Sequence, residues 1–248
     1  MPKQNVNGHD IYYEESGSGD ALIMIYGSID GSAQIFTSHM PELSKDFRLI
    51  LPDLRGLGRS SHVTDMQPSD WVSDLCGLLD ALNIESAHIY GGAMGSRPAL
   101  RLALDHPGRV KSLTIDWAIL DNDEASDRET ISNFGANVSP DRAANLQSHH
   151  GEDWAGVSDF YLKLRTSPAF KEYYDLREIS KDITVPTLIL RCDTDAKPEI
   201  HPLSHSLLAH QNIPNSWLSI YPNFRGNVAR LRPDEFHSIF RKFVASLT

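Results

Sequence analysis

The sequence has little cysteine, no long apolar run and no dense cluster of basic residues. Its two cysteines, Cys76 and Cys192, cannot make a framework of disulfides. No apolar stretch approaches the roughly 18 residues that cross a bilayer, and the polar first twenty residues do not look like a signal segment. We therefore expect a soluble, cytoplasmic protein with free thiols and no membrane partner.

Positive charge is also scarce. The 248 residues include 23 Lys and Arg against 33 Asp and Glu, which gives a formal net charge of −10. An acidic chain repels phosphate backbones, so nucleic acid is not an expected partner. Hydrophobic residues make up 40% of the chain, which is enough at this length to build one large core. This composition excludes a disordered chain and a coiled coil.

Short apolar runs alternate with amphipathic segments along most of the chain. The runs are rich in Ile, Leu and Val, as strands buried on both faces of a parallel sheet are; they cover residues 21–26, 47–51, 87–90, 110–115 and 187–190. The segments 69–82, 97–106 and 233–247 repeat apolar residues at helical spacing. The alternation predicts a doubly wound, mostly parallel α/β sheet. Near the N-terminus, Asn7-Gly8 predicts the turn of a β-hairpin.

Residues 121–182 interrupt this alternation. The segment is polar, mostly helical in pattern and contains several aromatic residues, among them Trp154 and Tyr161. We predict that it forms a helical cap inserted into an α/β core made of residues 1–120 and 183–248. The aromatic side chains predict an apolar or aromatic ligand beneath the cap.

A glycine-rich segment, Tyr90-Gly91-Gly92-Ala93-Met94-Gly95, lies between a predicted strand and a predicted helix. A sharp turn at such a junction needs small residues two before and two after its tip, and Gly91 and Gly95 meet that need. With residues 53–60 (DLRGLGRS) and 185–190 (VPTLIL), this segment resembles the α/β-hydrolase fold family over nearly the whole chain. The resemblance implies an eight-stranded sheet with the catalytic nucleophile at the turn.

The chain departs from that family at two catalytic positions. Ala93 stands where the family has Ser, Cys or Asp, and a methyl group cannot attack a carbonyl. The final loop, residues 223–229, should carry the catalytic His. It offers Gly226 at that position without a gap, or Asn227 with a one-residue deletion. Loss of a nucleophile or base costs on the order of a million-fold in turnover, so efficient hydrolysis by the usual route is not expected.

The third catalytic position is retained. Asp195 lies where the family usually has its acid, and Asp193 is the second choice. We interpret the pattern as a natural loss of the triad. An engineered Ser→Ala change at position 93 is the alternative, and it would leave the absent His unexplained.

The resemblance also implies an oxyanion hole made of backbone N–H groups. Met94 would supply one N–H and Ser28 the other, with Gly27 beside it in the loop after the third strand. Each such donor stabilises a developing enolate or alkoxide by roughly 3–4 kcal/mol. We therefore expect a lyase, isomerase, cyclase or cofactor-free oxygenase that needs no cofactor and no metal. Tyr26, at the start of this loop, could donate to a carbonyl or guide a proton.

A narrower resemblance concerns Ile115-Asp116-Trp117, Trp154 and Ser216–Ile220. These residues look like those of cofactor-independent 2,4-dioxygenases that open 3-hydroxy-4-quinolone rings. That likeness implies a bicyclic aromatic ligand against Trp117, Trp154 and Tyr161, although those enzymes use the His that this chain lacks. Arg225 could hold a substrate carboxylate, next to Asn227 and above Ala93.

Two other functions stay open. The chain could be a hydrolase that is rewired through Asp193, Asp195 or the histidine pair His149-His150, or one inactivated at Ala93. It could also be a non-catalytic receptor for a small molecule. In each case we expect the partner to be a small carbonyl or aromatic compound. Either a monomer or a homodimer is compatible with these functions.

Overall fold

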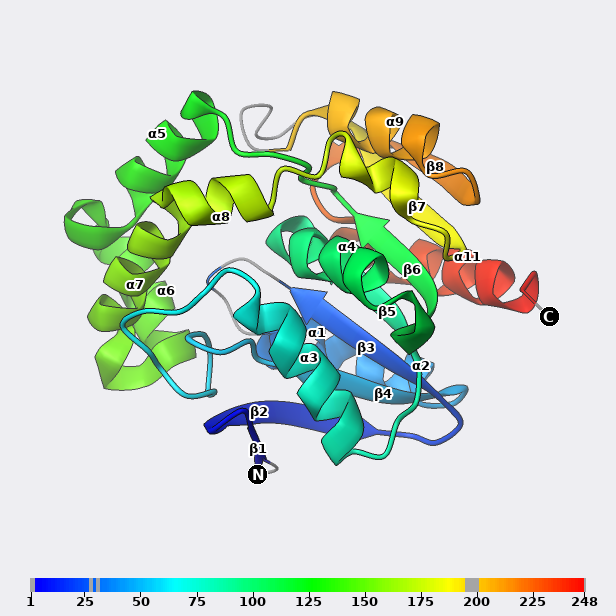
Figure 1. Cartoon of the computed structure of the whole chain (residues 1–248), viewed down its shortest axis with the longest axis horizontal. Coiled ribbons are helices and arrows are strands. Elements are labelled where there is room, and N and C mark those ends of the chain that lie inside the picture. The colour runs from blue at the N-terminus through cyan, green and yellow to red at the C-terminus, as the bar shows by residue number, and fades with distance from the viewer. Residues whose placement is uncertain (1–2, 27–28, 30–31, 195–200, 248) are drawn as a thin grey trace.

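The structure is a computed structural model that describes residues 3–26, 29, 32–194 and 201–247. Across these residues the strands form one sheet in the order β1-β2-β4-β3-β5-β6-β7-β8 (Figure 1). The β1–β2 and β2–β4 pairs are antiparallel and the other neighbours are parallel. The predicted eight-stranded, mostly parallel sheet is therefore confirmed. The strands are β1 (Lys3–Val6), β2 (His9–Ser16), β3 (Asp20–Tyr26), β4 (Phe47–Pro52), β5 (Ala87–Gly92), β6 (Val110–Asp116), β7 (Thr187–Thr194) and β8 (Ser216–Arg225).

Helices follow most of the parallel strands, and the three predicted from sequence correspond to α3, α4 and α11. In the described chain the helices are α1 (Ser32–Phe36), α2 (Met40–Leu43), α3 (Asp70–Ala81), α4 (Ser96–Asp105), α5 (Glu124–Asn133), α6 (Pro140–His150), α7 (Trp154–Thr166), α8 (Pro168–Tyr173), α9 (Leu203–Asn212), α10 (Val228–Leu231) and α11 (Pro233–Ala245).

The hairpin at the N-terminus forms as predicted. Val6 pairs with His9, and the two residues between them have positive φ angles, 51° at Asn7 and 82° at Gly8. A turn with two left-handed residues matches the twist of the flanking strands, and Asn-Gly tolerates it best.

The core lies on both faces of the sheet because alternate residues of each buried strand point to opposite sides. Ile23 and Ile89 pack in one apolar cluster with residues of α3 and α4. Leu22 and Tyr90, their neighbours along the same strands, pack in a second cluster with residues of α1 and α11. A sheet covered in this way presents its functional side chains at the carboxyl ends of its strands.

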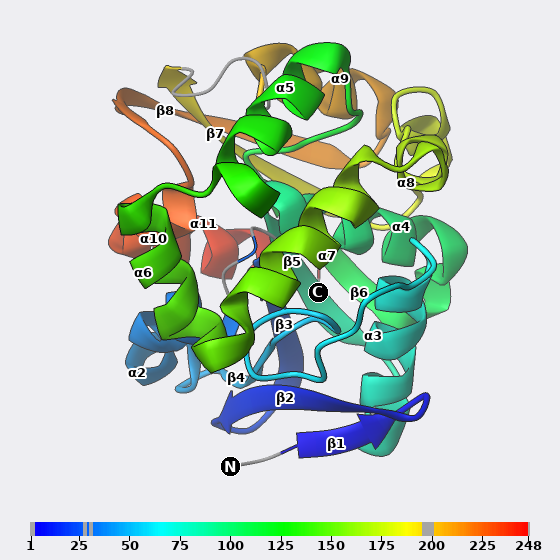
Figure 2. The same ribbon diagram turned by 90° about the vertical axis from the view of Figure 1, so that its left-hand side faces the viewer.

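Helices α5 to α8 stand beyond those carboxyl ends, and their helical content agrees with the prediction for residues 121–182 (Figures 1 and 2). The division into core and cap remains a prediction. In the described part of the chain, no helix has both the length and the apolar content needed to cross a bilayer.

The predicted final loop, residues 223–229, is shorter in the structure. Strand β8 continues to Arg225, which pairs with Thr194, and α10 begins at Val228. The Asp193 carboxylate accepts a 3.0 Å hydrogen bond from the N–H of Asn223, whose φ is 65°. This contact lies at an irregularity in the pairing of β7 with β8, which the local sequence does not predict.

Candidate active site

The sharp turn predicted at residues 91–95 is present. Ala93 lies at its tip, between β5 and α4, with a φ of 50° that residues other than glycine seldom adopt. A Cβ on Gly91 would lie 2.4 Å from the carbonyl oxygen of Gly95 and 2.6 Å from the Cβ of Ala99. Only glycine fits there, because the strand and the helix approach too closely for a side chain. The Ala93 methyl group thus lies at the tip of the turn, and its equivalence to a catalytic nucleophile stays a prediction.

Ser96 fixes the turn from the first position of α4. Its hydroxyl donates a 2.6 Å hydrogen bond to the carbonyl of Ala93 and accepts one of 3.1 Å from the N–H of Ile119. We call the turn at residues 91–95 the elbow. Because Ile119 follows β6, these two bonds join the elbow to the segment after β6.

Asn227 is fully engaged by protein groups. Its Oδ1 accepts hydrogen bonds of 3.0 Å from the Tyr90 hydroxyl and from the N–H of Arg230. Its Nδ2 donates to the carbonyl of Asp116 at 3.3 Å. A Cβ on Gly92 would lie 2.8 Å from this nitrogen, so the amide abuts the strand that leads to the elbow. These contacts give Asn227 a structural role, and a contact with substrate stays a prediction.

Asp116 holds the start of α10 against the end of β6. Its carboxylate accepts N–H bonds from Val228 at 3.0 Å and Ala229 at 2.8 Å, and a 2.9 Å bond from the Tyr90 hydroxyl. Burial raises the pKa of Asp116 to about 7, although the hydrogen bonds from Ala229, Val228 and Tyr90 oppose the shift. Both carboxyl oxygens are occupied, which favours a positioning role over proton transfer to a substrate.

Tyr26 ends β3 beside the elbow, since it pairs with Gly92. Its N–H donates to Ser32 Oγ at 2.7 Å, its ring meets Phe36 edge-on at 5.6 Å, and it shares an apolar cluster with Ala93. This position agrees with the predicted place in the site, while its role as a donor stays a prediction. The predicted residues Gly27, Ser28 and Asp195 lie outside the described residues.

A second left-handed residue ends the adjacent strand. Trp117 follows β6 with a φ of 66°, and its indole stacks on the imidazole of His201 with centroids 3.9 Å apart and planes 10° apart. Burial, and next the charge of Arg191, lower the pKa of His201 well below its ordinary value. The imidazole is therefore neutral, and the two rings form a flat aromatic stack.

Two buried guanidinium groups contact the side chain of Met94, the residue after the turn's tip. Nη1 of Arg165 lies 2.8 Å from Met94 Sδ, and Nη1 of Arg97 lies 3.5 Å from the same atom. Arg97 is 0% exposed and Arg165 is 4% exposed. Burial, and next repulsion from Arg165, lower the pKa of Arg97 well below its ordinary value. The guanidinium groups of Arg97 and Arg165 therefore lie beside the elbow, and Arg165 comes from α7.

The two arginines are held by neutral acceptors. Arg97 donates to the carbonyl of Asp121 and to Oδ1 of Asn122, and Arg165 donates to the same Oδ1 at 3.2 Å and to the Tyr161 hydroxyl at 3.1 Å. Among the described residues, no carboxylate forms an ion pair with either guanidinium. Sequence reasoning missed this pair. No local pattern indicated the pair, because α4 also carries Arg101 and Asp105 and Arg97 does not stand out among them.

The remaining predicted side chains are spread over the cap segment and β8. Tyr161 is buried on α7, where its ring meets Phe134 at 5.0 Å, and Trp154 begins the same helix half-buried. Arg225 is exposed at the end of β8, and no contact within the described residues ties it to the elbow. The structure therefore brings Tyr161 next to Arg165 and Met94, whereas Arg225 is not connected with them.

Comparison with known proteins agrees with this geometry. A family model described as alpha/beta hydrolase fold matches residues 20–195. A 2-hydroxymuconate semialdehyde hydrolase from a Pseudomonas species is 42% identical over 105 residues, 41% of this chain and 37% of that protein, so the match spans about a third of that relative. A 2-hydroxy-6-oxo-2,4-heptadienoate hydrolase from Pseudomonas putida is 28% identical over 243 residues, 87% of this chain and 83% of that protein.

A solved structure shows the same fold. It is a Ser-to-Ala mutant of a meta-cleavage product hydrolase from Pseudomonas fluorescens, complexed with acetates, with a TM-score of 0.78 and 24% identity. The match covers 100% of this chain and 98% of that chain.

Proposed function

Because the chain belongs to the α/β-hydrolase fold family, we propose that it is an enzyme that stabilises an oxyanion without a covalent nucleophile. The observation that carries the proposal is the backbone of Ala93, which keeps a φ of 50° although its methyl group cannot react. Such a conformation costs on the order of 1–3 kcal/mol. Retention of that strain supports a continuing role for the turn's backbone, above all for the N–H of Met94.

The proposed chemistry passes through an enolate. When a carbonyl substrate loses a proton or carbon dioxide from the adjacent carbon, the electron pair moves onto the carbonyl oxygen. The N–H groups of Met94 and Ser28 would stabilise that charge, and a proton then returns to carbon. Decarboxylation of a β-keto acid needs no general base, which suits a chain without the family's His. Tyr26, which pairs with Gly92 beside the elbow, would guide the returning proton.

We further propose that the substrate is an enol or keto carboxylate. Arg97 and Arg165 bury two guanidinium groups beside Met94, and neither forms an ion pair with a described carboxylate. A substrate carboxylate would offset part of their desolvation cost and would match their planar donors. The Pseudomonas putida relative acts, by its name, on a 2-hydroxy-6-oxo-2,4-heptadienoate, a carboxylate with enol and oxo groups.

The test is turnover of a panel of β-keto acids and 2-hydroxydienoates, followed by chromatography and mass spectrometry. Loss of carbon dioxide, or an isomer of unchanged mass, is the expected result, and it should vanish in Ala93→Trp, which fills the space above the elbow. Arg165→Met should raise KM about tenfold or more, since one charge-assisted contact contributes about 1.4 kcal/mol or more. A panel that returns unchanged would overturn the proposal and favour a receptor.

A hydrolase is the second candidate, because the relatives are named hydrolases. Ala93→Ser treated with a fluorophosphonate probe separates the two. We expect no covalent labelling in the intact mass, because Asn227 is not a base and its amide is already occupied. Stoichiometric labelling, or gain of water by any substrate of the unaltered protein, would instead favour the hydrolase.

A further inference from the structure

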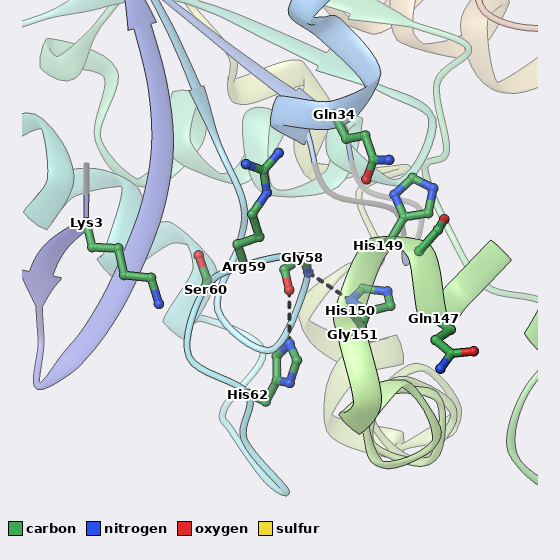
Figure 3. Close-up of a pocket in the computed structure, with 11 residues that line it drawn as sticks. Lys3, Gln34, Gly58, Arg59, Ser60, His62, Gln147, His149, His150 and Gly151 are labelled. Carbon is green, nitrogen blue, oxygen red and sulfur yellow. Dashed lines mark hydrogen bonds between the residues drawn. The ribbon is translucent and has the colours of Figure 1, made fainter. Parts of the chain in front are cut away.

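A cleft of about 670 Å³ opens between the core and the cap segment, residues 121–182. It shares no lining residue with the elbow. Its walls come from four separate places in the chain: Lys3 on β1, Gln34 on α1, residues 58–62, and residues 147–151 at the end of α6 (Figure 3). Its size falls in the range of pockets that hold small organic ligands, roughly 300–1,000 Å³.

The lining of this cleft is positive in a protein whose net charge is −10. It contains Lys3, Arg59 and the imidazoles of His62, His149 and His150, and no Asp or Glu. Figure 3 shows Arg59, Gln34 and His149 at one end of the cleft and the Lys3 side chain on the far side of Ser60. The donors therefore come from opposite walls, one in the core and one in the cap segment.

Lys3 and Arg59 carry the fixed positive charge of this lining. Lys3 forms no ion pair with a described residue. One nitrogen of Arg59, Nη1, contacts Glu14 Oε1 at 3.3 Å and the Tyr12 hydroxyl at 2.5 Å. The other side-chain nitrogens of Arg59 have no hydrogen bond to the described residues. Glu14 and the buried Asp53, which accepts the backbone N–H of Arg59 at 3.0 Å, partly balance this wall. The Arg59 guanidinium packs over the Tyr12 ring at 4.3 Å and keeps donors for a ligand.

Two imidazoles fix the floor of the cleft by binding the two backbone polar groups of one residue, Gly58. His150 Nδ1 accepts the N–H of Gly58 at 3.0 Å, which requires a neutral ring (Figure 3). His62 faces two acceptors, the Gly58 carbonyl at 3.0 Å and Asp153 Oδ2 at 2.9 Å. His62 therefore ties Gly58, in the core, to the exposed Asp153 of the cap segment. The floor is rigid and joins the core to the cap segment.

We propose that this cleft binds a small dianion, an organic phosphate or a dicarboxylate, that bridges the core and the cap segment. A dianion can engage Lys3 and Arg59 on one wall and His149 on the other, which a single charge cannot do across a cleft of this size. Binding would hold α6 against residues 58–62. The site is independent of the reaction proposed at the elbow.

The experiment is calorimetric titration of the full chain at neutral pH and low salt, with pyrophosphate and succinate as separate probes. Saturable binding of either probe is expected, and the one that binds more tightly identifies a phosphate or a dicarboxylate ligand. Lys3→Gln should weaken binding about fivefold, since one exposed charge contributes about 1 kcal/mol at low salt. Arg59→Gln should weaken it at least as much. Lys3 is exposed at the edge strand, so its variant will fold.

Lys242→Gln, an equal loss of charge on the exposed face of α11, is the matched control and should bind like the unaltered protein. Equal weakening in Lys242→Gln, or no saturable binding of either probe, would overturn the proposal. Amide hydrogen exchange in α6 should slow when the probe binds. Exchange that stays unchanged under saturating probe would overturn the bridging role.

Discussion

The hydroxyl of Tyr90 lies 3.0 Å from Oδ1 of Asn227, so the start of α10 is tied to the strand that leads into the elbow. The same hydroxyl lies 2.9 Å from Oδ2 of Asp116, so its one hydrogen is shared between the amide oxygen and the carboxylate. One phenol thus joins β5, the end of β6 and the start of α10. This cluster holds the carboxyl ends of the two strands against α10.

Tyr90→Phe should lower the free energy of unfolding by roughly 1–3 kcal/mol, because a buried hydrogen bond to a carboxylate and one to an amide are both lost. Tyr173→Phe is the control. Its hydroxyl bonds the Asp105 carboxylate at the surface at 3.0 Å, and its loss should cost less than about 0.5 kcal/mol. Urea unfolding of the two variants measures both values. Equal effects would show that the buried cluster does not stabilise the fold.

Gly91→Ala should be strongly destabilising, by about 3 kcal/mol or more, because the new methyl group would lie 2.4 Å from the Gly95 carbonyl oxygen. Gly108→Ala places a methyl group with no heavy atom within 4 Å. It should change stability by less than about 1 kcal/mol, in either direction. Thermal unfolding of the pair tests whether the elbow is as crowded as the geometry requires. A mild effect at Gly91 would mean that strand and helix can separate there.

The sheet and the elbow were predictable because their signals are local. Buried parallel strands need unbroken apolar runs, such as residues 21–26, and the crowded turn admits only glycine at position 91. The two-sided core follows from the same runs, since alternate residues of each strand face opposite sides.

The rest of the site depends on contacts between distant residues. The predicted loop at 223–229 was wrong in extent because Asp193 binds Asn223 from another strand and extends β8. The guanidinium pair was missed because Arg97 and Arg165, 68 positions apart in the sequence, become neighbours only when both side chains reach Met94 in the fold. Neither contact leaves a pattern in the linear sequence.

The bond between His150 and Gly58 should make stability depend on pH. Burial, and next the charges of His62 and His149, lower the pKa of His150 from 6.5 to about 4. The folded state therefore disfavours the protonated ring. The stability contributed by the neutral ring is complete above pH 6.5 and is lost as the pH falls toward 4, by about 3 kcal/mol in all.

His150→Gln tests this dependence, because its amide oxygen can still accept the N–H of Gly58 but does not titrate. Urea unfolding at pH 7 and at pH 4.5 should show a smaller loss of stability on acidification in the variant than in the unaltered protein. His39, whose pKa is also lowered to about 4 by burial, titrates in both proteins and cancels in the difference. Parallel pH profiles would contradict the assignment to His150.

Ala93→Gly addresses the strain in the elbow. A glycine at a φ of 50° relieves a conformation that alanine adopts at a cost. Relief of roughly 1–3 kcal/mol of strain is partly offset by the greater freedom of glycine in the unfolded chain, about 0.4–1 kcal/mol, so the free energy of unfolding should stay the same or rise by up to about 2 kcal/mol. Ala103→Gly, in the regular helix α4, has no strain to relieve and should lower the free energy of unfolding by about 1 kcal/mol or more.

If the turn stabilises an oxyanion through its backbone N–H groups, Ala93→Gly should also keep the turnover of the unaltered protein. A cost at position 93 equal to that at position 103 would mean that the turn stores no strain, and the argument from retained strain would fail with it.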